Sequence, residues 1–229
     1  MSDLEHIPER LAAIRTRIDE ATQHAGRPRG SVRLVAVSKT KPAEAIRIAY
    51  AAGQRDFGEN YVQELANKAA ELADLPDLRW HFIGALQRNK AKITTNLAAL
   101  IHTVDRDELV GELEKRAAAL GKKLDVLIEV NVGDESSKSG VAIDALAALL
   151  EKARNAPHLQ TRGLMAIPPF LDDPEAVRPY FAKLRKLRED HGGAAALPEL
   201  SMGMSHDFAV AIEEGATLVR VGTAIFGSR

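Results

Sequence analysis

The sequence has 229 residues, a length that suits one large domain or two small ones. Hydrophobic residues make up 45% and charged residues 28%, which is typical of a globular protein and excludes an intrinsically disordered chain. The 31 basic and 32 acidic side chains leave a net charge of -1, so no strong field attracts nucleic acid or an anionic membrane. The absence of cysteine excludes a disulfide framework and a thiolate metal site.

The first segment is predicted to be an amphipathic helix that ends before Gly26 and Pro28. Its apolar residues recur at steps of three and four and form one stripe: Leu4, Ile7, Leu11, Ile14, Ile18 and Ala21. The segment is charged throughout and lacks the apolar core of a secretory signal. No window of the sequence has the length of a membrane span. We therefore expect a cytoplasmic protein.

After this helix, short apolar runs alternate with helical stretches. The predicted strands are Arg33–Ser38, Arg55–Gly58, Arg79–Gly84, Leu100–Val104, Val126–Asn131, Gly163–Ile167, Leu200–Gly203 and Leu218–Gly222. The helices between them are predicted to begin near Pro42, Asn60, Asn89, Arg106, Ile143, Pro174 and Ser205. The segment 192–197, GGAAAL, is predicted to be a loop.

Strands that alternate with helices indicate a parallel sheet. About eight such units match a (β/α)₈ TIM barrel, here with an extra N-terminal helix and with residues 1–229 as one domain. An open doubly wound sheet is the alternative. The first strand lacks the G-x-G-x-x-G turn that such a sheet often carries, which favours the barrel.

Functional groups in such barrels lie at the C-terminal ends of the strands. Alternation with period two places Val35, Val37 and Lys39 on one face of the first strand, which directs the Lys39 amine to the mouth of the barrel. Burial lowers the pKa of a lysine, and a neutral amine can form a Schiff base with an aldehyde. The residues alone do not decide between this hypothesis and a simpler one, in which Lys39 is a solvated lysine at a strand end, next to Lys41.

The last two predicted strands end in segments that suit a phosphate group. Gly222 lets an anion approach the backbone, and Thr223 is expected to open a short helix whose free N–H groups face that anion. The seventh strand ends in the segment 201–205, SMGMS, which has two hydroxyls and another glycine. Tight turns without a ligand are the alternative, but phosphate sites after strands seven and eight recur in this fold.

Two polar residues are predicted to lie inside apolar strands. Arg220 stands between two valines, where a guanidinium requires a partner or a ligand, and a structural ion pair with Glu129 is the simpler alternative. His81 is expected to be a hydrogen-bonded core residue rather than a ligand contact.

Three loop residues have alternative roles. Asn60 is expected to cap the second barrel helix, a position from which it can also touch a ligand, and Ser205 is expected to cap the helix that includes His206 and Asp207. Lys138 is a candidate for a second amine near the mouth, although most such lysines are solvated. The seven histidines are scattered and indicate no metal site, and no Ser/His/Asp triad has local support.

Seven segments, in order and over nearly the whole chain, resemble the pyridoxal 5′-phosphate (PLP) homeostasis protein family, also called the YggS/PROSC family. They are AVSKTKP (36–42), FGENYVQE (57–64), WHFIGALQRNK (80–90), SKSG (137–140), RGLMAIP (162–168), SMGMSHD (201–207) and VRVGTAIFG (219–227). The one departure is Ala85, which stands where proline is usual in the family.

The resemblance implies a single barrel like the N-terminal domain of alanine racemase. It implies that PLP is carried as a Schiff base on Lys39, that Ser201, Gly222 and Thr223 contact its phosphate, and that Arg220 faces its pyridine ring. Asn60 and Met202 match positions near the cofactor. The implied cofactor-binding residues are Lys39, Asn60, Ser201, Met202, Arg220, Gly222 and Thr223.

The family is thought to buffer, deliver or protect PLP without firm catalytic activity, and the residues agree with this. A cation that faces the pyridine nitrogen disfavours its protonation and makes the ring a weaker electron sink. No tyrosine stands where a catalytic phenol is expected, and the chain ends soon after GTAIFG, so no further C-terminal domain is expected.

We therefore expect a monomeric, non-catalytic PLP carrier, with PLP-dependent apoenzymes as candidate recipients. A PLP-dependent enzyme such as a weak amino-acid racemase is the alternative. A barrel aldolase that uses Lys39 on a phosphorylated sugar is the third hypothesis.

Overall fold

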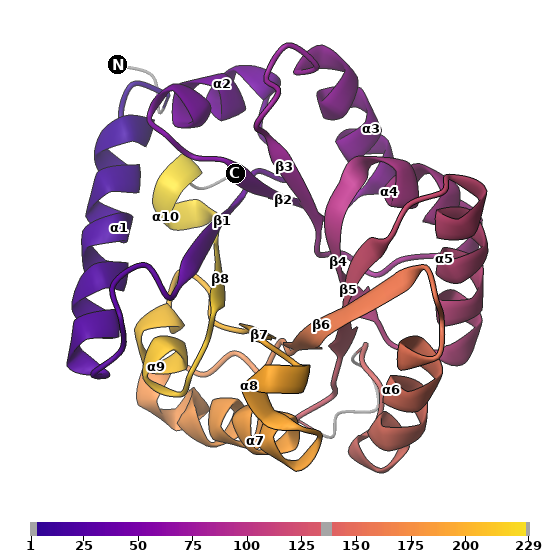
Figure 1. Cartoon of the computed structure of the whole chain (residues 1–229). Coiled ribbons are helices and arrows are strands. Elements are labelled where there is room, and N and C mark those ends of the chain that lie inside the picture. The colour runs from indigo at the N-terminus through magenta and orange to yellow at the C-terminus, as the bar shows by residue number, and fades with distance from the viewer. Residues whose placement is uncertain (1–3, 134–138, 228–229) are drawn as a thin grey trace.

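A closed ring of eight parallel strands forms the centre of the protein (Figure 1), as seen in a computed structural model that describes residues 4–133 and 139–227. The strands are β1 (Arg33–Val37), β2 (Asp56–Glu59), β3 (Arg79–Phe82), β4 (Ala98–Val104), β5 (Leu124–Glu129), β6 (Leu159–Met165), β7 (Glu199–Ser201) and β8 (Leu218–Val221). Val35 on β1 pairs with Arg220 on β8, which closes the ring. The predicted barrel is confirmed, and the open doubly wound sheet is wrong.

Helices surround the ring and cover its outer face (Figure 1). The α-helices are α1 (Ile7–His24), α2 (Ala43–Ala51), α3 (Val62–Glu71), α4 (Ala91–Leu97), α5 (Asp107–Ala119), α6 (Leu146–Arg154), α7 (Arg178–Asp190), α8 (Gly193–Ala196), α9 (Phe208–Glu213) and α10 (Thr223–Phe226). Three 3₁₀ turns, η1 (Arg88–Lys90), η2 (Ile143–Ala145) and η3 (Pro174–Val177), precede α4, α6 and α7.

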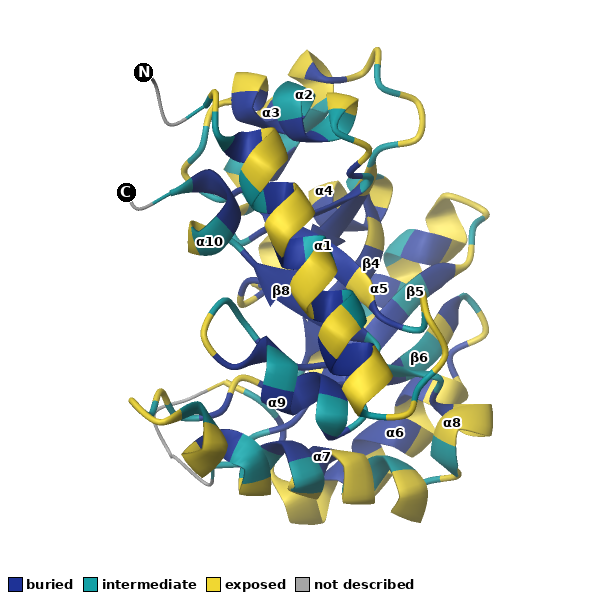
Figure 2. Cartoon of the chain, turned by 90° about the vertical axis from the view of Figure 1, so that its left-hand side faces the viewer, coloured by how far each residue is buried: buried dark blue, intermediate teal, exposed yellow. Residues whose placement is uncertain are grey.

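Helix α1 lies outside the ring, against α9 and α10 (Figure 2), as the extra N-terminal helix of the prediction. The predicted apolar stripe is buried from Ile7 through Leu11 to Ala21. Burial of each large aliphatic side chain contributes roughly 1.5–3 kcal/mol relative to exposure. The exposed residues of α1 face outward in Figure 2, so the helix stabilises the barrel by covering one side of it.

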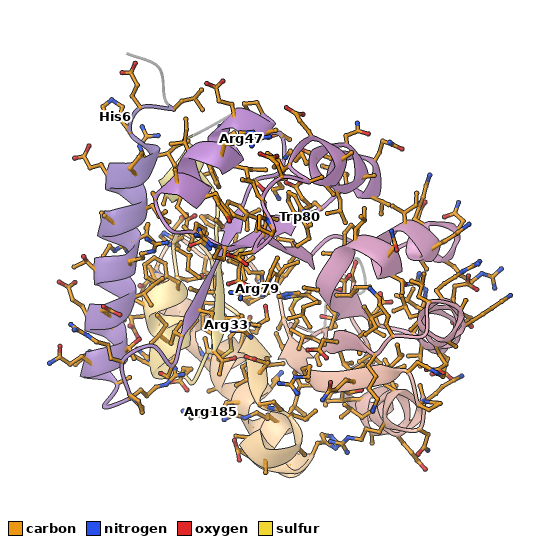
Figure 3. All side chains as sticks on the ribbon, turned by 45° about the horizontal axis from the view of Figure 1, so that its top comes forward. His6, Arg33, Arg47, Arg79, Trp80 and Arg185 are labelled. Atoms are coloured by element: carbon orange, nitrogen blue, oxygen red, sulfur yellow. The ribbon has the colours of Figure 1, made fainter. Side chains whose placement is uncertain are left out.

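The strands carry different residues on their two faces because successive side chains alternate. The face toward the helices contributes to one large apolar core. The other face contributes a separate apolar cluster, which consists of Val35, Leu100, Leu127, Met165 and Leu218. Polar side chains lie on this second face before and after the cluster. Arg33 and Arg79, at the starts of their strands, lie near the middle of the ring in Figure 3, whereas His6 lies at the outer surface.

Two predicted helix caps and one predicted loop are wrong. Helix α3 begins at Val62, with Tyr61 at its N-cap, and α9 begins at Phe208, with Asp207 at its N-cap. Neither Asn60 nor Ser205 therefore caps a helix. The segment 192–197 contains α8, because its run of alanines has high helix propensity. Among the described residues, no helix has both the length and the apolar composition to cross a membrane.

Candidate functional site

Two of the predicted site residues follow β1 and β8, whose ends lie against each other. Lys39 lies half-buried in the turn that follows β1, and Gly222 follows β8. A Cβ atom on Gly222 would lie 3.1 Å from the Val37 backbone oxygen and 3.3 Å from the Val37 Cβ. The residue at 222 therefore has to be small for the loop after β8 to lie against β1, the strand that precedes Lys39.

The loops after β7 and β8 also meet each other. The Thr223 hydroxyl donates to the Ser205 Oγ at 3.3 Å, and the backbone N–H of Arg220 donates to the Gly203 oxygen at 2.9 Å. Gly203 has a φ of 91°, which favours glycine. Thr223 opens α10, and the first N–H groups of a helix have no intrahelical acceptor. These loops therefore combine hydroxyls, glycines and N–H donors, which is the chemistry that a phosphate group requires.

Arg220 is buried beneath the loops after β7 and β8, which we call the cup, and it donates a hydrogen bond to Ser201. Its side chain is 3% exposed; Nη1 donates to the Ser201 Oγ at 2.6 Å and Nη2 donates to the Ala166 oxygen at 2.9 Å. Burial lowers the pKa of Arg220 to about 10, although the charges of Glu129 and Asp207 oppose this. The guanidinium thus stays charged at neutral pH.

The simpler alternative for Arg220, a direct ion pair with Glu129, is wrong. Among the described residues, the Arg220 guanidinium bonds to Ser201 and Ala166 and forms no ion pair with Glu129. Glu129 acts on it only through its charge. Met202, the residue after Ser201, is fully buried in the core between the strands and the helices. It therefore supports the end of β7 from the outer side.

Asn60 has a buried side-chain oxygen without a hydrogen-bond partner. It follows β2, and its Oδ1 atom is among the buried polar atoms that nothing in the structure satisfies. Gly84 packs directly against its backbone, since a Cβ on Gly84 would lie 2.0 Å from the Asn60 oxygen. An unsatisfied buried acceptor costs about 1–3 kcal/mol, so such an atom in a native protein requires an explanation. A ligand that donates a hydrogen bond at this strand end is one.

A buried lysine, which the sequence analysis missed, holds the end of β1. Lys68 on α3 donates to the Ser38 backbone oxygen and to the Glu59 Oε1, both at 2.7 Å. The Ser38 hydroxyl donates to the same Glu59 atom at 2.7 Å. Burial raises the pKa of Glu59, whereas Lys68 and Ser38 favour its charged form. The residue directly before Lys39 is therefore fixed on both its backbone and its side chain.

The residue directly after Lys39 is fixed as well. The Thr40 N–H donates to the Glu64 Oε1 at 2.5 Å, and Lys68 donates to the same Glu64 atom at 2.7 Å. Thr40 has a φ of 65° and is the one non-glycine residue with positive φ among those that the structure describes. The spacing of Glu64 and Lys68, four residues apart on one helix, is a signal that could have indicated this ion pair.

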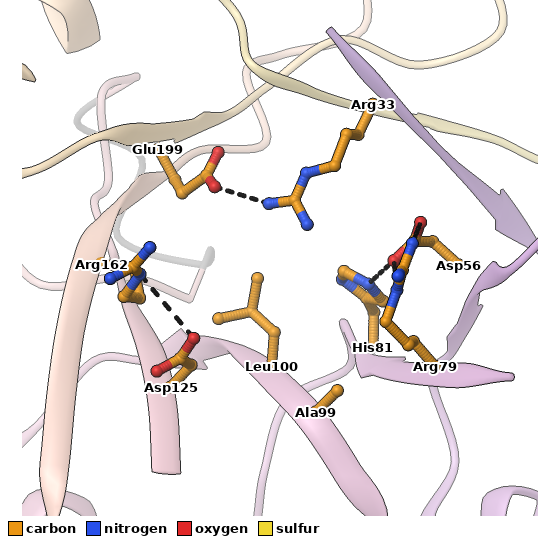
Figure 4. A pocket seen from close by; sticks show the side chains of 9 residues that line it. All are labelled: Arg33, Asp56, Arg79, His81, Ala99, Leu100, Asp125, Arg162 and Glu199. Atoms are coloured by element: carbon orange, nitrogen blue, oxygen red, sulfur yellow. Dashed lines mark hydrogen bonds and ion pairs between the residues drawn. The ribbon is translucent and has the colours of Figure 1, made fainter. Parts of the chain in front are cut away.

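His81 is a hydrogen-bonded core residue, as predicted. Its two ring nitrogens contact Asp56 at 2.8 Å and His102 at 2.9 Å. His81 also borders a hollow of about 370 Å³ at the N-terminal ends of the strands (Figure 4), where three arginines face three carboxylates. The pairs are Arg33–Glu199, Arg79–Asp56 and Arg162–Asp125. That end of a barrel serves stability, so the candidate site is the opposite end.

Two further predictions concern a metal and a second amine. Within residues 4–133 and 139–227, no group of three or more histidine, aspartate or glutamate side chains could hold a metal ion. Lys138 lies outside the described residues, and its proposed place near the mouth stays a prediction.

The fold and the site define a barrel of the alanine racemase N-terminal class. The family model described as alanine racemase, N-terminal domain, matches residues 10–229. Alanine racemase from Corynebacterium glutamicum has a TM-score of 0.72 over 99% of this chain and 62% of that chain, and its 19% identity shows the shared fold alone.

Full-length relatives narrow the assignment. The pyridoxal phosphate homeostasis protein of Aquifex aeolicus is 51% identical over 96% of this chain and 97% of that protein, and the one of Escherichia coli K12 is 42% identical over 100% and 98%. PipY of Synechococcus elongatus, solved with PLP bound, has a TM-score of 0.85 and 42% identity over 96% of this chain and all of that chain. The chain belongs to the pyridoxal phosphate homeostasis protein family.

Proposed function

We propose that this protein binds PLP at the C-terminal ends of the barrel strands and acts in PLP homeostasis, with the PLP bonded covalently to Lys39. The observation that carries the proposal is the support of the turn at Lys39. Lys68 and Glu59 hydrogen-bond to the residue before it, Ser38, and Glu64 accepts from the residue after it, Thr40. The similarity to PipY with bound PLP supports the choice of ligand.

The residues around this turn fit PLP chemically. The Lys39 amine would add to the PLP aldehyde carbon, and loss of one water molecule would leave a Schiff base. Thr223, with the glycine before it and with Ser205, would hold the phosphate. The Asn60 Oδ1, which lacks a partner, would accept a hydrogen bond from the ligand. Met202 and Ser201 would support the β7 end of the cup.

A carrier fits the site better than a catalyst does. Arg220 is charged and would face the pyridine ring, where a cation disfavours protonation of the ring nitrogen. An unprotonated ring is a weak electron sink, so PLP held in this way is poorly suited to turn over amino acids. The naming of the relatives points to a regulatory role. We infer a monomeric cytoplasmic carrier that passes PLP to dependent apoenzymes.

An absorption spectrum of the purified protein, followed by borohydride reduction and peptide mapping, tests the covalent site. We expect a yellow protein that borohydride bleaches and a reduced adduct on Lys39 alone. Lys39→Ala should abolish the adduct and keep the fold, as measured by circular dichroism. Lys41→Ala, two residues further on in the same turn region, is the matched control and should keep the adduct.

Other outcomes would redirect the assignment. An adduct that persists in Lys39→Ala would move the site, with Lys138 as the first residue to test. Steady exchange of an amino-acid α-proton in heavy water, lost in Lys39→Ala, would indicate a racemase. A colourless protein that borohydride traps only with a sugar phosphate would indicate an aldolase.

A further inference from the structure

A chain of buried polar side chains crosses the interior of the barrel and ends at Arg220. The Asp56 Oδ1 lies 2.8 Å from the His81 Nε2, and the His81 Nδ1 lies 2.9 Å from the His102 Nε2. The His102 Nδ1 lies 2.9 Å from the Ser201 Oγ, which accepts from Arg220 at 2.6 Å. The five residues come from β2, β3, β4, β7 and β8 and all are buried. The proposed function leaves both histidines without a role.

One end of the chain is an obligate acceptor. Asp56 also accepts two hydrogen bonds from Arg79, at 2.8 and 2.6 Å, as Figure 4 shows. Burial opposes the charge of Asp56, but the hydrogen bonds from Arg79 and His81 outweigh it and hold the pKa of Asp56 well below its usual range. A charged carboxylate only accepts, so the His81 Nε2 carries a hydrogen and donates it to Asp56.

The middle of the chain consists of two imidazole rings, those of His81 and His102. Burial lowers the pKa of His102 well below its usual value, and the charges of Arg220 and Arg33 lower it further. A neutral imidazole has one donor and one acceptor nitrogen. In a neutral His81 ring whose Nε2 donates, the Nδ1 accepts from the His102 Nε2, and the Nδ1 of a neutral His102 is then left as an acceptor. Its partner among the described residues is the Ser201 hydroxyl, which would donate its hydrogen to this nitrogen while its oxygen accepts from Arg220.

We propose that both rings are neutral, that His102 is a positioning residue for Arg220, and that Asp56, His81 and His102 together fix the Ser201 hydroxyl so that its oxygen faces the guanidinium. Every hydrogen bond in the chain then runs in one direction, from Arg220 to Asp56. The guanidinium is held in a single orientation by Ser201 on one side and by the Ala166 oxygen on the other. The role of Arg220 toward PLP rests on the proposed function, whereas the orientation itself does not.

The proposal gives Ser201 a different part from the one the family resemblance implies. A serine hydroxyl has one hydrogen, and this chain uses it toward His102. The Ser201 side chain then cannot donate to a phosphate while the chain is intact. The phosphate would depend for its donors on the Ser205 hydroxyl, which accepts from Thr223, and on backbone N–H groups, including that of Thr223.

Histidine NMR of the ligand-free protein tests the direction of the chain. With ¹⁵N-labelled histidine, and with His102→Asn and His81→Gln used for assignment, we expect His102 and His81 to be neutral and protonated at Nε2 at neutral pH. A hydrogen on the Nδ1 of His102, or a doubly protonated ring at either position, would overturn the proposal, because Ser201 would then be free to donate elsewhere.

Two amide variants test the effect on Arg220. The amide of asparagine overlaps the Nδ1 position of a histidine ring, so His102→Asn keeps an acceptor next to Ser201. The amide of glutamine overlaps the Nε2 position, so His102→Gln keeps the contact with His81 and loses the contact with Ser201. Both variants bury one amide, so a purely structural role predicts the same result for both.

The readout in the ligand-free protein is the NMR signal of the Arg220 guanidinium. We expect separate Nη signals, which indicate restricted rotation, in the wild type and in His102→Asn, and averaged signals in His102→Gln. In the PLP-loaded protein, the pH midpoint of the absorption change should shift by roughly one unit in His102→Gln and stay near wild type in His102→Asn. Equal behaviour of the two variants in the ligand-free protein would refute the proposal.

The two measurements separate this proposal from the proposed function. If the wild type forms no adduct with PLP, the proposed function fails, and the guanidinium signals still decide the role of His102. If the adduct forms on Lys39 and the guanidinium signals are the same in both variants, only the positioning role fails.

Discussion

Lys68 donates a hydrogen bond to the backbone oxygen of Ser38 at 2.7 Å, although the two residues lie 30 positions apart in the sequence. This contact fixes the last residue before Lys39 to a helix on the outside of the barrel. The same ammonium neutralises Glu59, which is fully buried. A single side chain thus links the stability of the barrel to the geometry of the proposed PLP-bearing turn.

Lys68→Met should destabilise the protein by about 3 kcal/mol, because it leaves the Glu59 carboxylate buried without its cation. It should also lower PLP occupancy, because the turn at Lys39 loses its support. Urea unfolding followed by circular dichroism measures the first effect, and absorbance of the bound PLP measures the second.

Lys152→Met is the control for Lys68→Met, since it removes an exposed ion pair with Asp107 and should cost less than about 1 kcal/mol. The double variant Lys68→Met, Glu59→Gln should recover much of the lost stability, because the buried charge is then gone. A loss below about 1 kcal/mol in Lys68→Met would show that Glu59 is neutral in the native protein.

Thr40→Asn should stabilise the protein by about 0.5–1 kcal/mol. Thr40 has a φ of 65°, which is costly for a β-branched residue, whereas asparagine tolerates this region. Thr40→Val keeps the branched shape and should change the stability by less than about 0.5 kcal/mol. Thermal unfolding of the three proteins gives the comparison. If Thr40→Asn is no more stable than Thr40→Val, the positive φ at residue 40 does not penalise a β-branched side chain and the prediction is wrong.

Gly222→Ala should weaken PLP binding and cost about 1 kcal/mol of stability, because the added methyl group would press on the Val37 backbone oxygen, 3.1 Å away. The φ of Gly222 is -118°, so the cost comes from contact and not from the backbone conformation. Gly111→Ala in α5 is the matched control. Its new Cβ would have no atom within 4 Å, and a helical alanine should stabilise the protein by about 1 kcal/mol. Titration of PLP with both variants would contradict the prediction if their affinities were the same.

Glu129→Gln should remove a pH dependence of stability. Burial and the charge of Asp105 raise the pKa of Glu129 from 4.5 to about 7, against the opposing effect of Arg220. Between these pH values the native state holds a proton that the unfolded chain has lost. The free energy of unfolding therefore falls as the pH rises through this window, by up to about 3 kcal/mol in total.

Urea unfolding at pH 5, 6, 7 and 8 measures this effect as the difference between the wild type and Glu129→Gln. We expect the glutamine variant to gain relative stability from pH 5 to pH 8, since its side chain stays neutral. Parallel profiles for the two proteins would mean that Glu129 titrates near its ordinary pKa in the native state.

The sequence predicts the barrel well because each strand has a local signal, a short apolar run with alternating side chains. Val35 and Val37 alternate with residues that face the helices, and the repeat of apolar runs and helical stretches specifies parallel strands. Strand ends shift by a few residues; β6, for example, begins at Leu159 instead of Gly163. Its first half carries polar residues that a search for apolar runs passes over.

The sequence likewise predicts some residues of the candidate site and mispredicts the role of another. Lys39, Gly222 and Thr223 stand at strand ends, where chain order alone predicts functional groups. Asn60 was expected to be a cap, yet α3 begins two residues later and leaves its side-chain oxygen without a partner. Whether a polar residue near a helix start acts as a cap depends on backbone dihedral angles that its neighbours in space impose.

Alternation by itself predicted that Lys39 and Arg220 point inward, and chain order predicted that the ends of β7 and β8 suit an anion. Only the tertiary structure decided that Lys68 and Glu59 hold the Lys39 turn, and that His81 and His102 join Asp56 to Ser201. The physical reason is that a strand pattern gives the direction of a side chain but not its height in the barrel. The register of strand pairing and the closure of the ring set that height, and with it which inward residues come within hydrogen-bond distance.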